Sequence, residues 1–552
     1  MSTVSISPDV DVRANVDLRR LDWRYLLPLP EAGQFRRLVV PGGDEALAAA
    51  IVSLGIAESV NLRLTGKRDA DAVVALYPSQ VTPALIAESL APDGVFYSEH
   101  VSWWTSAALA RRRARRAFAQ ARLFPTGVYW ALPAFLPCQM YIPLDVSGGL
   151  RWYMDTLFAP STRLQRALQP GLRALGRLDA RAVFPVSHYA VVGTAGGPPR
   201  TEGLVYAHPA LPIHDQETLH PLLITAGNDT NRVVIAPFTA RGRQPVAIVK
   251  LARHPTLNDG IGVEQRTLAR LRASLDAGLQ RTLPQPLGRR MWSTLAVGIE
   301  TPAPGRSLAA ISRQFGMSQR RHIAHLQMAA EWLIQFHRAA EPGSGAWRVE
   351  DVRVWVDRPT AEYEAIFGVT DAEEALFAAL RRQARSLLGA ACPTVWNHWG
   401  FEERNLFVHG STLTVIDWED GRLGPPLLDL LYFVMRWSAG ARGQHSPAGV
   451  LESFRDVFLC EAGGQVEVAA RDIIRRYMAA LDLDHHFYPL LLVLVCVHRA
   501  IGRFKAEGAL QVRAGNARAR NPYVDYVGVL AENVDRIFGV GLDEGNYGSI
   551  SY

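Results

Sequence analysis

A polar loop that contains His398 and Asn405 carries the residues most suited to chemistry in this sequence. A hairpin is predicted after the loop, and the apolar run LTVI in its second strand ends near Asp417. The side-chain oxygens of asparagine and aspartate are ligands that a hard cation prefers. We therefore predict that Asn405 and Asp417 converge on one metal ion.

A second pair of charged residues lies upstream of this loop. Lys250 is near the end of the predicted strand PVAIVKLAR, on a face that is otherwise apolar. Glu264 opens an apolar stripe on a predicted helix, and the stripe consists of Leu268, Leu271 and Leu275. A carboxylate on such a stripe is costly unless it is paired, so an ion pair between Lys250 and Glu264 is predicted. The alternatives are a solvent-facing lysine and a glutamate that interacts with the helix dipole.

These residue types are the ones that phosphoryl transfer requires. The reaction needs a cation on the nucleotide phosphates, a partner for that cation, ligands for magnesium and a carboxylate near the acceptor hydroxyl. The strands RVVIAPF and PVAIVKLAR form a hairpin pattern, and helices dominate after them. A strand-rich beginning and a helix-rich end predict two lobes for the chain after about residue 222.

The loop and hairpin resemble the aminoglycoside phosphotransferase and choline kinase group, whose fold is related to the protein kinases. The family pattern is His-x-Asp, four residues and Asn, followed by Ile-Asp-Trp/Phe-Glu and later by Asp-Leu. This chain has His398, Asn405, the run from Ile416 to Glu419, and Asp429 with Leu430 in the same order and spacing. The resemblance covers about residues 222–538.

The resemblance implies a role for each of these residues. Lys250 would bind the phosphates of ATP, Glu264 would hold Lys250, and Asn405 and Asp417 would bind Mg²⁺. The family's hinge, whose backbone meets adenine, would comprise Val297, Gly298, Ile299 and Glu300. The acceptor would be a small hydroxylated metabolite.

The chain departs from the family at Gly400, which stands where the catalytic aspartate is expected. Glycine cannot accept the proton of the acceptor hydroxyl. Two explanations stay open. Either Glu402 or Glu403 supplies the carboxylate in a catalytic loop that also holds His398, or the domain binds nucleotide as a scaffold without efficient transfer. General-base help is typically worth about a hundred- to ten-thousand-fold, so its loss slows an enzyme without abolishing it.

The N-terminal part has a different pattern. RRLVVPGGDEALAAAI places Gly42 and Gly43 between a predicted strand and a helix, and further strands alternate with helices. This pattern resembles class I S-adenosylmethionine-dependent methyltransferases over about residues 38–145 and implies a Rossmann-like fold and that cofactor. Pro41 stands where an acidic residue is usual, and VNLRLTG lacks the terminal acid that would hold ribose hydroxyls. A degenerate sheet domain used for contacts is the alternative.

The predicted helix ALARRRARRAFAQ concentrates arginines between Arg111 and Arg116. A basic amphipathic helix can contact an anionic membrane surface, and the alternative is a solvated arginine face. The net charge of +6 suits anionic ligands such as nucleotides, and we do not expect nucleic acid as a partner. The longest apolar run, from Leu490 to Val497, is too short to cross a bilayer and predicts a buried helix.

Composition and cysteine spacing complete the prediction. The chain has 552 residues, 48% of them hydrophobic, and its four cysteines form no CxxC pair, which favours a reducing, cytoplasmic context. We expect an α/β Rossmann-like domain over residues 1–158, a connector over 159–221, and an α+β, two-lobed, protein-kinase-like domain over 222–540. In that domain the N-lobe would comprise residues 222–300 and the C-lobe 301–540.

Overall fold

The computed structural model describes residues 18–64, 66–79, 81–136, 138–160, 162–177, 185–197, 203–209, 211, 218–226, 232–340, 343, 345–444, 446–508, 518 and 521–538. The chain forms two compact units. Unit 1 comprises Met1–Phe158, Ala167–Arg266 and Pro284–Pro302, and unit 2 comprises Ala159–Arg166, Thr267–Leu283 and Ala303–Tyr552. The predicted connector falls partly outside the described residues, and the domain boundaries stay predictions.

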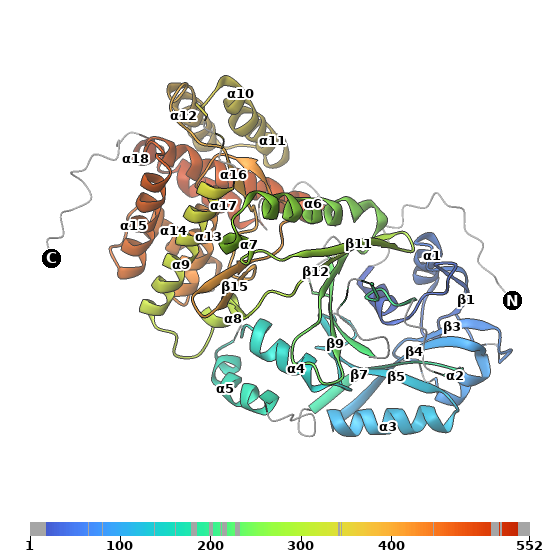
Figure 1. Cartoon of the computed structure of the whole chain (residues 1–552). Helices are drawn as coiled ribbons and strands as arrows, with labels where there is room; N and C mark the ends of the chain where they lie inside the picture. The colour runs from blue at the N-terminus through green and yellow to red at the C-terminus, as the bar shows by residue number, and fades with distance from the viewer. Residues whose placement is uncertain are drawn as a thin grey trace. The chain divides into compact units, whose positions relative to one another are not determined.

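Four parallel strands form the first part of the sheet in unit 1 (Figure 1). Their order is β2-β1-β3-β4, and the pairs β1–β2, β1–β3 and β3–β4 are all parallel. The strands and their connecting helices are β1 (Phe35–Val39), α1 (Glu45–Ser53), β2 (Ala57–Asn61), β3 (Ala70–Ala75), α2 (Pro83–Ser89) and β4 (Leu90–Ser106). Helix α1 begins after Asp44, which accepts a hydrogen bond from the Leu47 N–H, and α2 begins after Thr82 in the same way.

Beyond β4 the sheet becomes antiparallel and continues without interruption to twelve strands. The order after β4 is β7-β5-β6-β8-β9-β10-β12-β11. These strands are β5 (Phe124–Leu132), β6 (Met140–Pro143), β7 (Pro185–Thr194), β8 (Leu219–Ile224), β9 (Val233–Thr239), β10 (Ile248–Leu251), β11 (Pro286–Trp292) and β12 (Leu295–Glu300). Because β6 pairs with β8, one sheet runs through residue 222, where the sequence predicted the start of a separate domain.

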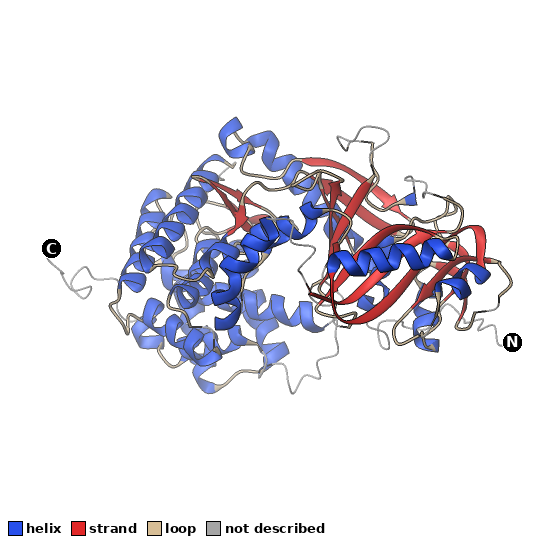
Figure 2. Cartoon of the chain, turned by 90° about the horizontal axis from the view of Figure 1, so that it is seen from below, coloured by secondary structure: helices blue, strands red, loops and turns tan. Residues whose placement is uncertain are grey.

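Helices cover both faces of this sheet (Figure 2). Side chains of α1 and of the 3-10 segment η2 (Leu18–Leu26) belong to one apolar cluster with the strands. Side chains of α2 and α3 (Ala107–Gln120) belong to another. Further helical segments of unit 1 are α4 (Ser147–Trp152), η3 (Tyr153–Leu157), α5 (Arg163–Arg177), which crosses into unit 2, and η6 (Pro255–Leu257).

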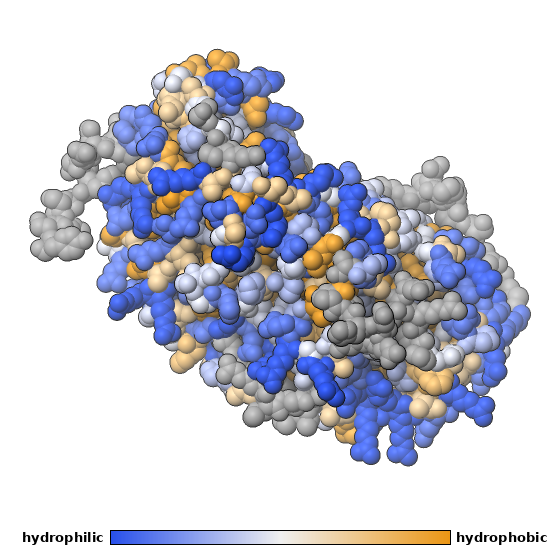
Figure 3. All heavy atoms as spheres, viewed as in Figure 1, coloured by the Kyte–Doolittle hydropathy of each residue, from blue (hydrophilic) through white to orange (hydrophobic). Residues whose placement is uncertain are grey.

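Helix α3 carries the predicted basic run. Its apolar side, which includes Phe118, is buried against the sheet, whereas Arg112, Arg113 and Arg116 are exposed. Hydrophilic side chains project from the surface where α3 lies (Figure 3). Contact of this face with an anionic membrane stays a prediction.

A buried ion pair fixes η2 to the strand that carries Lys250. Arg253 follows β10 and is fully buried; its guanidinium donates to both carboxylate oxygens of Asp22, at 2.9 Å from Nε to Oδ1 and 2.9 Å from Nη2 to Oδ2. Arg253 also donates to the carbonyl oxygen of Thr225 at 2.8 Å. Bidentate pairing satisfies both charges in the core, so residues near the N-terminus hold the end of β10 in place.

Unit 2 is mainly helical and has one large apolar core. Its helical segments are α7 (Ala277–Gln280), α8 (Leu308–Ser312), α9 (Gln319–Ala339), α10 (Val349–Val352), η7 (Arg353–Asp357), α11 (Arg358–Phe367), α12 (Asp371–Ser386), α13 (Leu428–Ala441), α14 (Pro447–Phe458), α15 (Gln465–Ala480), α16 (Phe487–Gly508), α17 (Pro522–Ala531) and α18 (Val534–Phe538). Strands β13 (Arg306–Ser307), β15 (Leu406–His409) and β16 (Thr412–Val415) form one small sheet, and β14 (Val395–Asn397) pairs with β17 (Arg422–Gly424). Helix α6 (Asn258–Ser274) begins in unit 1 and ends in unit 2.

Helix α16 contains the longest apolar run. Within the described residues, its segment Phe487–Ala506 is the one that is long and apolar enough to cross a membrane. Every residue from Leu490 to Val497 is nevertheless buried in the core of unit 2. The core position accounts for the apolar composition, as the sequence predicted.

Candidate functional site

Lys250 lies in a buried cluster of charges in unit 1. Its Nζ atom is 2.6 Å from Oε1 of Glu264 and 3.0 Å from Oε1 of Glu300. Arg232 contacts the other carboxylate oxygen of Glu264. The side chains of Lys250, Glu264 and Glu300 are each at most 5% exposed, so the charges neutralise one another away from water. The ion pair predicted between Lys250 and Glu264 is present, and its role toward a nucleotide stays a prediction.

The register of the sheet explains how Glu300 reaches Lys250. Strand β12 pairs antiparallel with β10, so that Lys250 lies opposite Gly298 and Ile248 lies opposite Glu300. Glu300 is therefore a diagonal neighbour of Lys250 on the same face, within reach of a long side chain. A Cβ atom on Gly298 would lie 3.0 Å from Ile261 and 3.2 Å from Gln265, both on α6. Glycine at this position lets α6 pack closely and bring Glu264 to the lysine.

The residues predicted as a hinge lie in strand β12, and their contact with adenine stays a prediction. Val297, Gly298 and Ile299 lie in β12, which pairs with β10 on one side and β11 on the other. Backbone groups of an interior strand form ladder hydrogen bonds with both neighbours. The sheet thus occupies the groups that the resemblance assigned to adenine, and the side chain of Glu300 contacts Lys250 instead.

Asn405 and Asp417 flank the β15–β16 hairpin in unit 2. Leu406 pairs with Val415, and the N–H of Ile416 donates to the Asn405 carbonyl oxygen at 3.0 Å. Asp417 follows directly, with a φ of 72°, a left-handed backbone that is uncommon for a residue other than glycine and is often found at functional sites. The hairpin therefore places Asn405 beside the residue that precedes Asp417.

The side chain of Asn405 is oriented by the loop. Its Nδ2 donates to the carbonyl oxygen of Gly400 at 2.9 Å, which assigns the amide orientation. Among the described residues, no donor is hydrogen bonded to its Oδ1. An amide oxygen and the Asp417 carboxylate are oxygen ligands of the kind that Mg²⁺ prefers, so this donor set fits such an ion.

His398 and Asp429 hold the loop. The Asp429 carboxylate accepts the N–H of His398 at 2.5 Å and the N–H of Trp399 at 2.9 Å. Burial raises the pKa of Asp429, and these donors and His398 oppose that rise. Trp399 has a φ of 59°, so the two anchored N–H groups hold a left-handed turn directly before Gly400. Asp429 thus has a structural role at the start of α13.

The ring of His398 is also fully engaged. Nδ1 accepts the N–H of Gly400 at 3.0 Å, and Nε2 lies 2.8 Å from the carbonyl oxygen of Ile416, to which it donates in the neutral tautomer. Burial lowers the pKa of His398. The neutral ring therefore positions the loop, and neither nitrogen is free to carry a proton to a substrate.

The two glutamates that follow Gly400 contact different partners. Glu403 Oε1 accepts a hydrogen bond from Ser312 Oγ at 2.6 Å, and burial raises the pKa of Glu403. Glu402 Oε2 accepts from the Tyr432 hydroxyl at 3.3 Å and lies 3.5 Å from Arg436 Nε, with 21% of its side chain exposed. Glu402 has the looser contacts and is the more accessible of the two.

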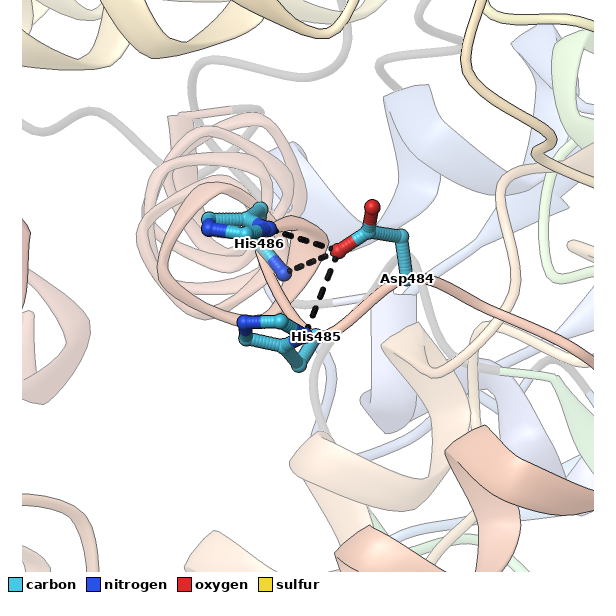
Figure 4. A group of neighbouring side chains, drawn as sticks. All are labelled: Asp484, His485 and His486. Atoms are coloured by element: carbon cyan, nitrogen blue, oxygen red, sulfur yellow. Dashed lines mark hydrogen bonds and ion pairs between the residues drawn. The ribbon is translucent and has the colours of Figure 1, made fainter. Parts of the chain in front are cut away.

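A separate cluster lies at the start of α16 (Figure 4). Asp484 Oδ1 lies 3.4 Å from Nδ1 of His485 and 2.8 Å from Nδ1 of His486, and the three residues could each offer one ligand atom to a metal. The His486 N–H donates to the same oxygen at 2.8 Å, and this hydrogen bond is the main cause of the lowered pKa of Asp484. All three residues are exposed, and the turn that precedes α16 accounts for the arrangement.

One segment of the chain, which contains both the Lys250 cluster and the loop around Gly400, matches a known protein family. Residues 230–456 match the model of the phosphotransferase enzyme family. The predicted resemblance is thereby confirmed for the C-terminal part, and the match supports a kinase-like phosphotransferase fold there. We call residues 230–456 the phosphotransferase region.

Solved structures give weaker similarities. A thermostable mutant of the aminoglycoside phosphotransferase APH(4)-Ia is 14% identical, with a TM-score of 0.35, over 56% of this chain and 93% of its own. A choline/ethanolamine kinase family protein from Mesorhizobium loti is 14% identical, with a TM-score of 0.32, over 61% and 95%. The macrolide 2'-phosphotransferase MphH from Brachybacterium faecium is 17% identical, with a TM-score of 0.33, over 57% and 91%. Similarity at this level adds no argument about activity, and no curated protein matches the chain.

The site residues of the phosphotransferase region are distributed over both units. Lys250, Glu264 and Glu300 belong to unit 1, whereas Asn405 and Asp417 belong to unit 2. The structure brings each set together within its own unit. That the two sets share one pocket stays a prediction.

Three contacts were missed by sequence reasoning: Glu300 with Lys250, Arg232 with Glu264, and Ser312 with Glu403. The first had a usable signal, because alternation along VGIE places Gly298 and Glu300 on one strand face. The other two join segments whose separation along the chain gives no local pattern.

Proposed function

We propose that the phosphotransferase region transfers a phosphoryl group from ATP, with Mg²⁺, to a small hydroxylated molecule. The buried ion pair of Lys250 and Glu264, 2.6 Å apart in a region that matches the family, is the observation that carries this proposal. Lys250 would bind the nucleotide phosphates while Glu264 and Glu300 limit its movement. Asn405 and Asp417 would hold the metal, which neutralises charge on the transferred group.

Glu402 is the group that we propose as the proton acceptor in the absence of an aspartate at position 400. Its contacts of 3.3 and 3.5 Å are longer than the 2.6 Å hydrogen bond of Glu403, and its side chain is partly accessible. Arg436, whose Nε atom is 3.5 Å from Oε2 of Glu402, would help to orient this side chain. Glu403 would instead join the loop to α8.

Gly400 itself favours a second function, in which the region binds nucleotide without efficient transfer. A Cβ atom at this position would lie 3.2 Å from His398 Nδ1 and 3.4 Å from Asn405 Nδ2. An aspartate would fit after these neighbours move by a few tenths of an ångström. Its absence therefore has no strong steric cause, which is consistent with a loop whose catalytic group has been lost.

Nucleotide binding and turnover of the full chain test both functions. We expect ADP with Mg²⁺ to raise the midpoint of thermal unfolding, and ATP to be consumed in the presence of a pool of hydroxylated acceptors. E402Q should then lower the transfer rate by about a hundredfold or more, whereas S312A should leave it nearly unchanged. Binding without transfer, with transfer appearing in G400D, would favour the second function. If ADP with Mg²⁺ shifts the midpoint of thermal unfolding of neither the wild-type protein nor K250M, both functions are excluded.

For the N-terminal part we propose a Rossmann-like domain. The support is the order β2-β1-β3-β4, in which the chain leaves β1 in one direction to β2 and then returns to β3 on its other side. Ligands of such sheets bind where the strand order reverses. Gly42 lies there with a φ of 86°, and a Cβ atom on it would lie 2.4 Å from the Leu76 carbonyl oxygen.

The residues at this position do not fit S-adenosylmethionine well, because β2 ends at Asn61 without the carboxylate that would hold ribose hydroxyls. We therefore derive no methyl-transfer step. Titration of S-adenosylmethionine into the full chain provides the test, and saturable binding at micromolar concentration would restore the methyltransferase hypothesis.

A further inference from the structure

Two arginines of unit 2 lie against the residues that flank Gly400. Arg422 opens β17, and its Cζ atom is 4.0 Å from the ring centroid of Trp399. Arg499 lies on α16, and its Cζ atom is 3.3 Å from the ring centroid of Tyr432, the residue whose hydroxyl donates to Glu402. Strand β17 and helix α16 thus bring two guanidinium groups to the loop where transfer would take place.

Neither arginine is held in a close ion pair within the described part of the chain. Among the described residues, the side chains of Arg422 and Arg499 donate no hydrogen bond and form no ion pair within 4.0 Å. Nη2 of Arg499 is buried without an acceptor. Partial desolvation lowers the pKa of Arg422, Asp420 and Asp429 oppose this change, and the nearby charge of Arg499 adds to it. A buried donor without an acceptor is destabilising, which indicates that the arrangement serves a ligand.

The carboxylates around the pair attract it, but none of them forms an ion pair with it within 4.0 Å among the described residues. Glu402 contacts Arg436, and Asp429 accepts two backbone N–H groups of the loop. Asp420 is exposed and acts on Arg422 only at longer range. The surroundings of the two unpaired arginines therefore favour an anion and disfavour a cation.

We propose that Arg422 and Arg499 bind an anionic group, a phosphate or a carboxylate, of the molecule that accepts the phosphoryl group. Guanidinium groups match the geometry of both anions and can donate two parallel hydrogen bonds to either. The acceptor is thus a hydroxylated anion and not a cationic amine. The inference rests on the proposed function, because it places the acceptor beside Gly400 and Glu402.

The phosphates of the nucleotide have the same chemistry as an anionic acceptor. The anion bound by the two arginines could therefore belong to the acceptor or to the nucleotide. Substitution of the arginines distinguishes these cases, because it weakens binding of only the ligand that they contact. If the pair belongs to the acceptor site, substitutions there weaken binding of a small phosphorylated alcohol and leave ADP unaffected. If it belongs to the nucleotide site, the reverse holds.

Binding to the full chain provides the experiment, with glycerol 3-phosphate, glycerol and choline as hydroxylated probes of negative, zero and positive charge. We expect saturable binding of glycerol 3-phosphate, with affinity at least tenfold above that of glycerol or choline, and a loss of affinity as salt is added. R422Q should weaken glycerol 3-phosphate binding about tenfold or more, since this exposed residue can be replaced without disturbing the core. R499K should retain part of the affinity, and R499Q should lose it.

R382Q is the matched control, because Arg382 is an exposed arginine of α12 in the same unit. It should bind glycerol 3-phosphate as the wild type does. Equal binding of the three probes, no saturable binding of glycerol 3-phosphate, or unchanged binding by R422Q would overturn the inference. So would a loss of ADP binding in R422Q with glycerol 3-phosphate binding retained. A wild-type protein that binds glycerol 3-phosphate through these arginines but does not bind ADP would contradict the proposed function alone.

Discussion

In unit 1 the buried Lys250 is surrounded by carboxylates, whereas in unit 2 the buried Asp429 is surrounded by backbone N–H groups. Lys250 contacts Glu264 and Glu300, and Glu264 also contacts Arg232. Asp429 accepts the N–H groups of His398 and Trp399. The first arrangement depends on side chains of opposite charge, and the second on the path of the chain.

The difference shows how the loop around Gly400 keeps its shape without a carboxylate at that position. His398 and Asn405 of the loop and Asp429 of α13 fix the loop's backbone, although Gly400 has no carboxylate. Backbone anchoring does not depend on the side chain at position 400. The charged cluster around Lys250 does depend on each of its side chains, because the charge of each one is neutralised by another.

The largest expected effect comes from K250M. It leaves Glu264 and Glu300 buried with one cation fewer, and loss of one member of a buried ion pair costs about 3–5 kcal/mol of the free energy of unfolding. Urea unfolding at neutral pH measures this difference. Lys505, whose side chain is 61% exposed in its pair with Glu362, is the control, and K505M should cost at most about 1 kcal/mol. Equal stability of K250M and wild type would mean that the cluster is not charged in the folded protein.

An intermediate effect is expected from D429A. Two buried N–H groups lose their acceptor, and we expect a loss of roughly 2–4 kcal/mol in the free energy of unfolding. Amide hydrogen exchange should accelerate at His398 and Trp399. D525A removes an exposed carboxylate from α17 and should change neither measurement. Unchanged exchange in D429A would show that the loop is held without the carboxylate.

The smallest effect is expected from E99Q, which replaces a buried carboxylate whose hydrogen-bond partners are neutral. Glu99 accepts the Tyr77 N–H at 2.8 Å and the Tyr97 hydroxyl at 2.9 Å, and burial raises its pKa from 4.5 to about 7. The folded protein then holds a proton that the unfolded chain releases, so stability falls as pH rises from 4.5 to 7. E99Q should remove this fall, and its stability relative to wild type should increase by up to about 3 kcal/mol between pH 4 and pH 8.

Unfolding of both proteins across this pH range provides the measurement. E88Q replaces an exposed glutamate of α2 and should follow the wild type at every pH. If the free energies of unfolding of E99Q and wild type differ by the same amount at every pH, Glu99 is ionised throughout this range. Neutral hydrogen-bond partners would then hold a buried carboxylate in its charged form as well as charged partners do.

Much of the candidate site could be predicted because its signals are local. The run LTVI before Asp417 gave the hairpin, and the leucine stripe after Glu264 gave helix α6 and the pair with Lys250. The continuity of the sheet could not be predicted. Met140 pairs with Ile224 through backbone groups, and no periodicity in either segment specifies a partner so far along the chain.

The sequence by itself determined which side chains are available and how they alternate along each strand and helix, since these depend on local periods of two and 3.6 residues. It also determined that position 400 lacks a carboxylate. Only the tertiary structure decided that Glu300 turns to Lys250, that Asp429 holds the loop, and that Arg422 and Arg499 lie against Trp399 and Tyr432. The reason is that the energy of a buried charge depends on its neighbours in space, and those neighbours come from segments that chain order does not bring together.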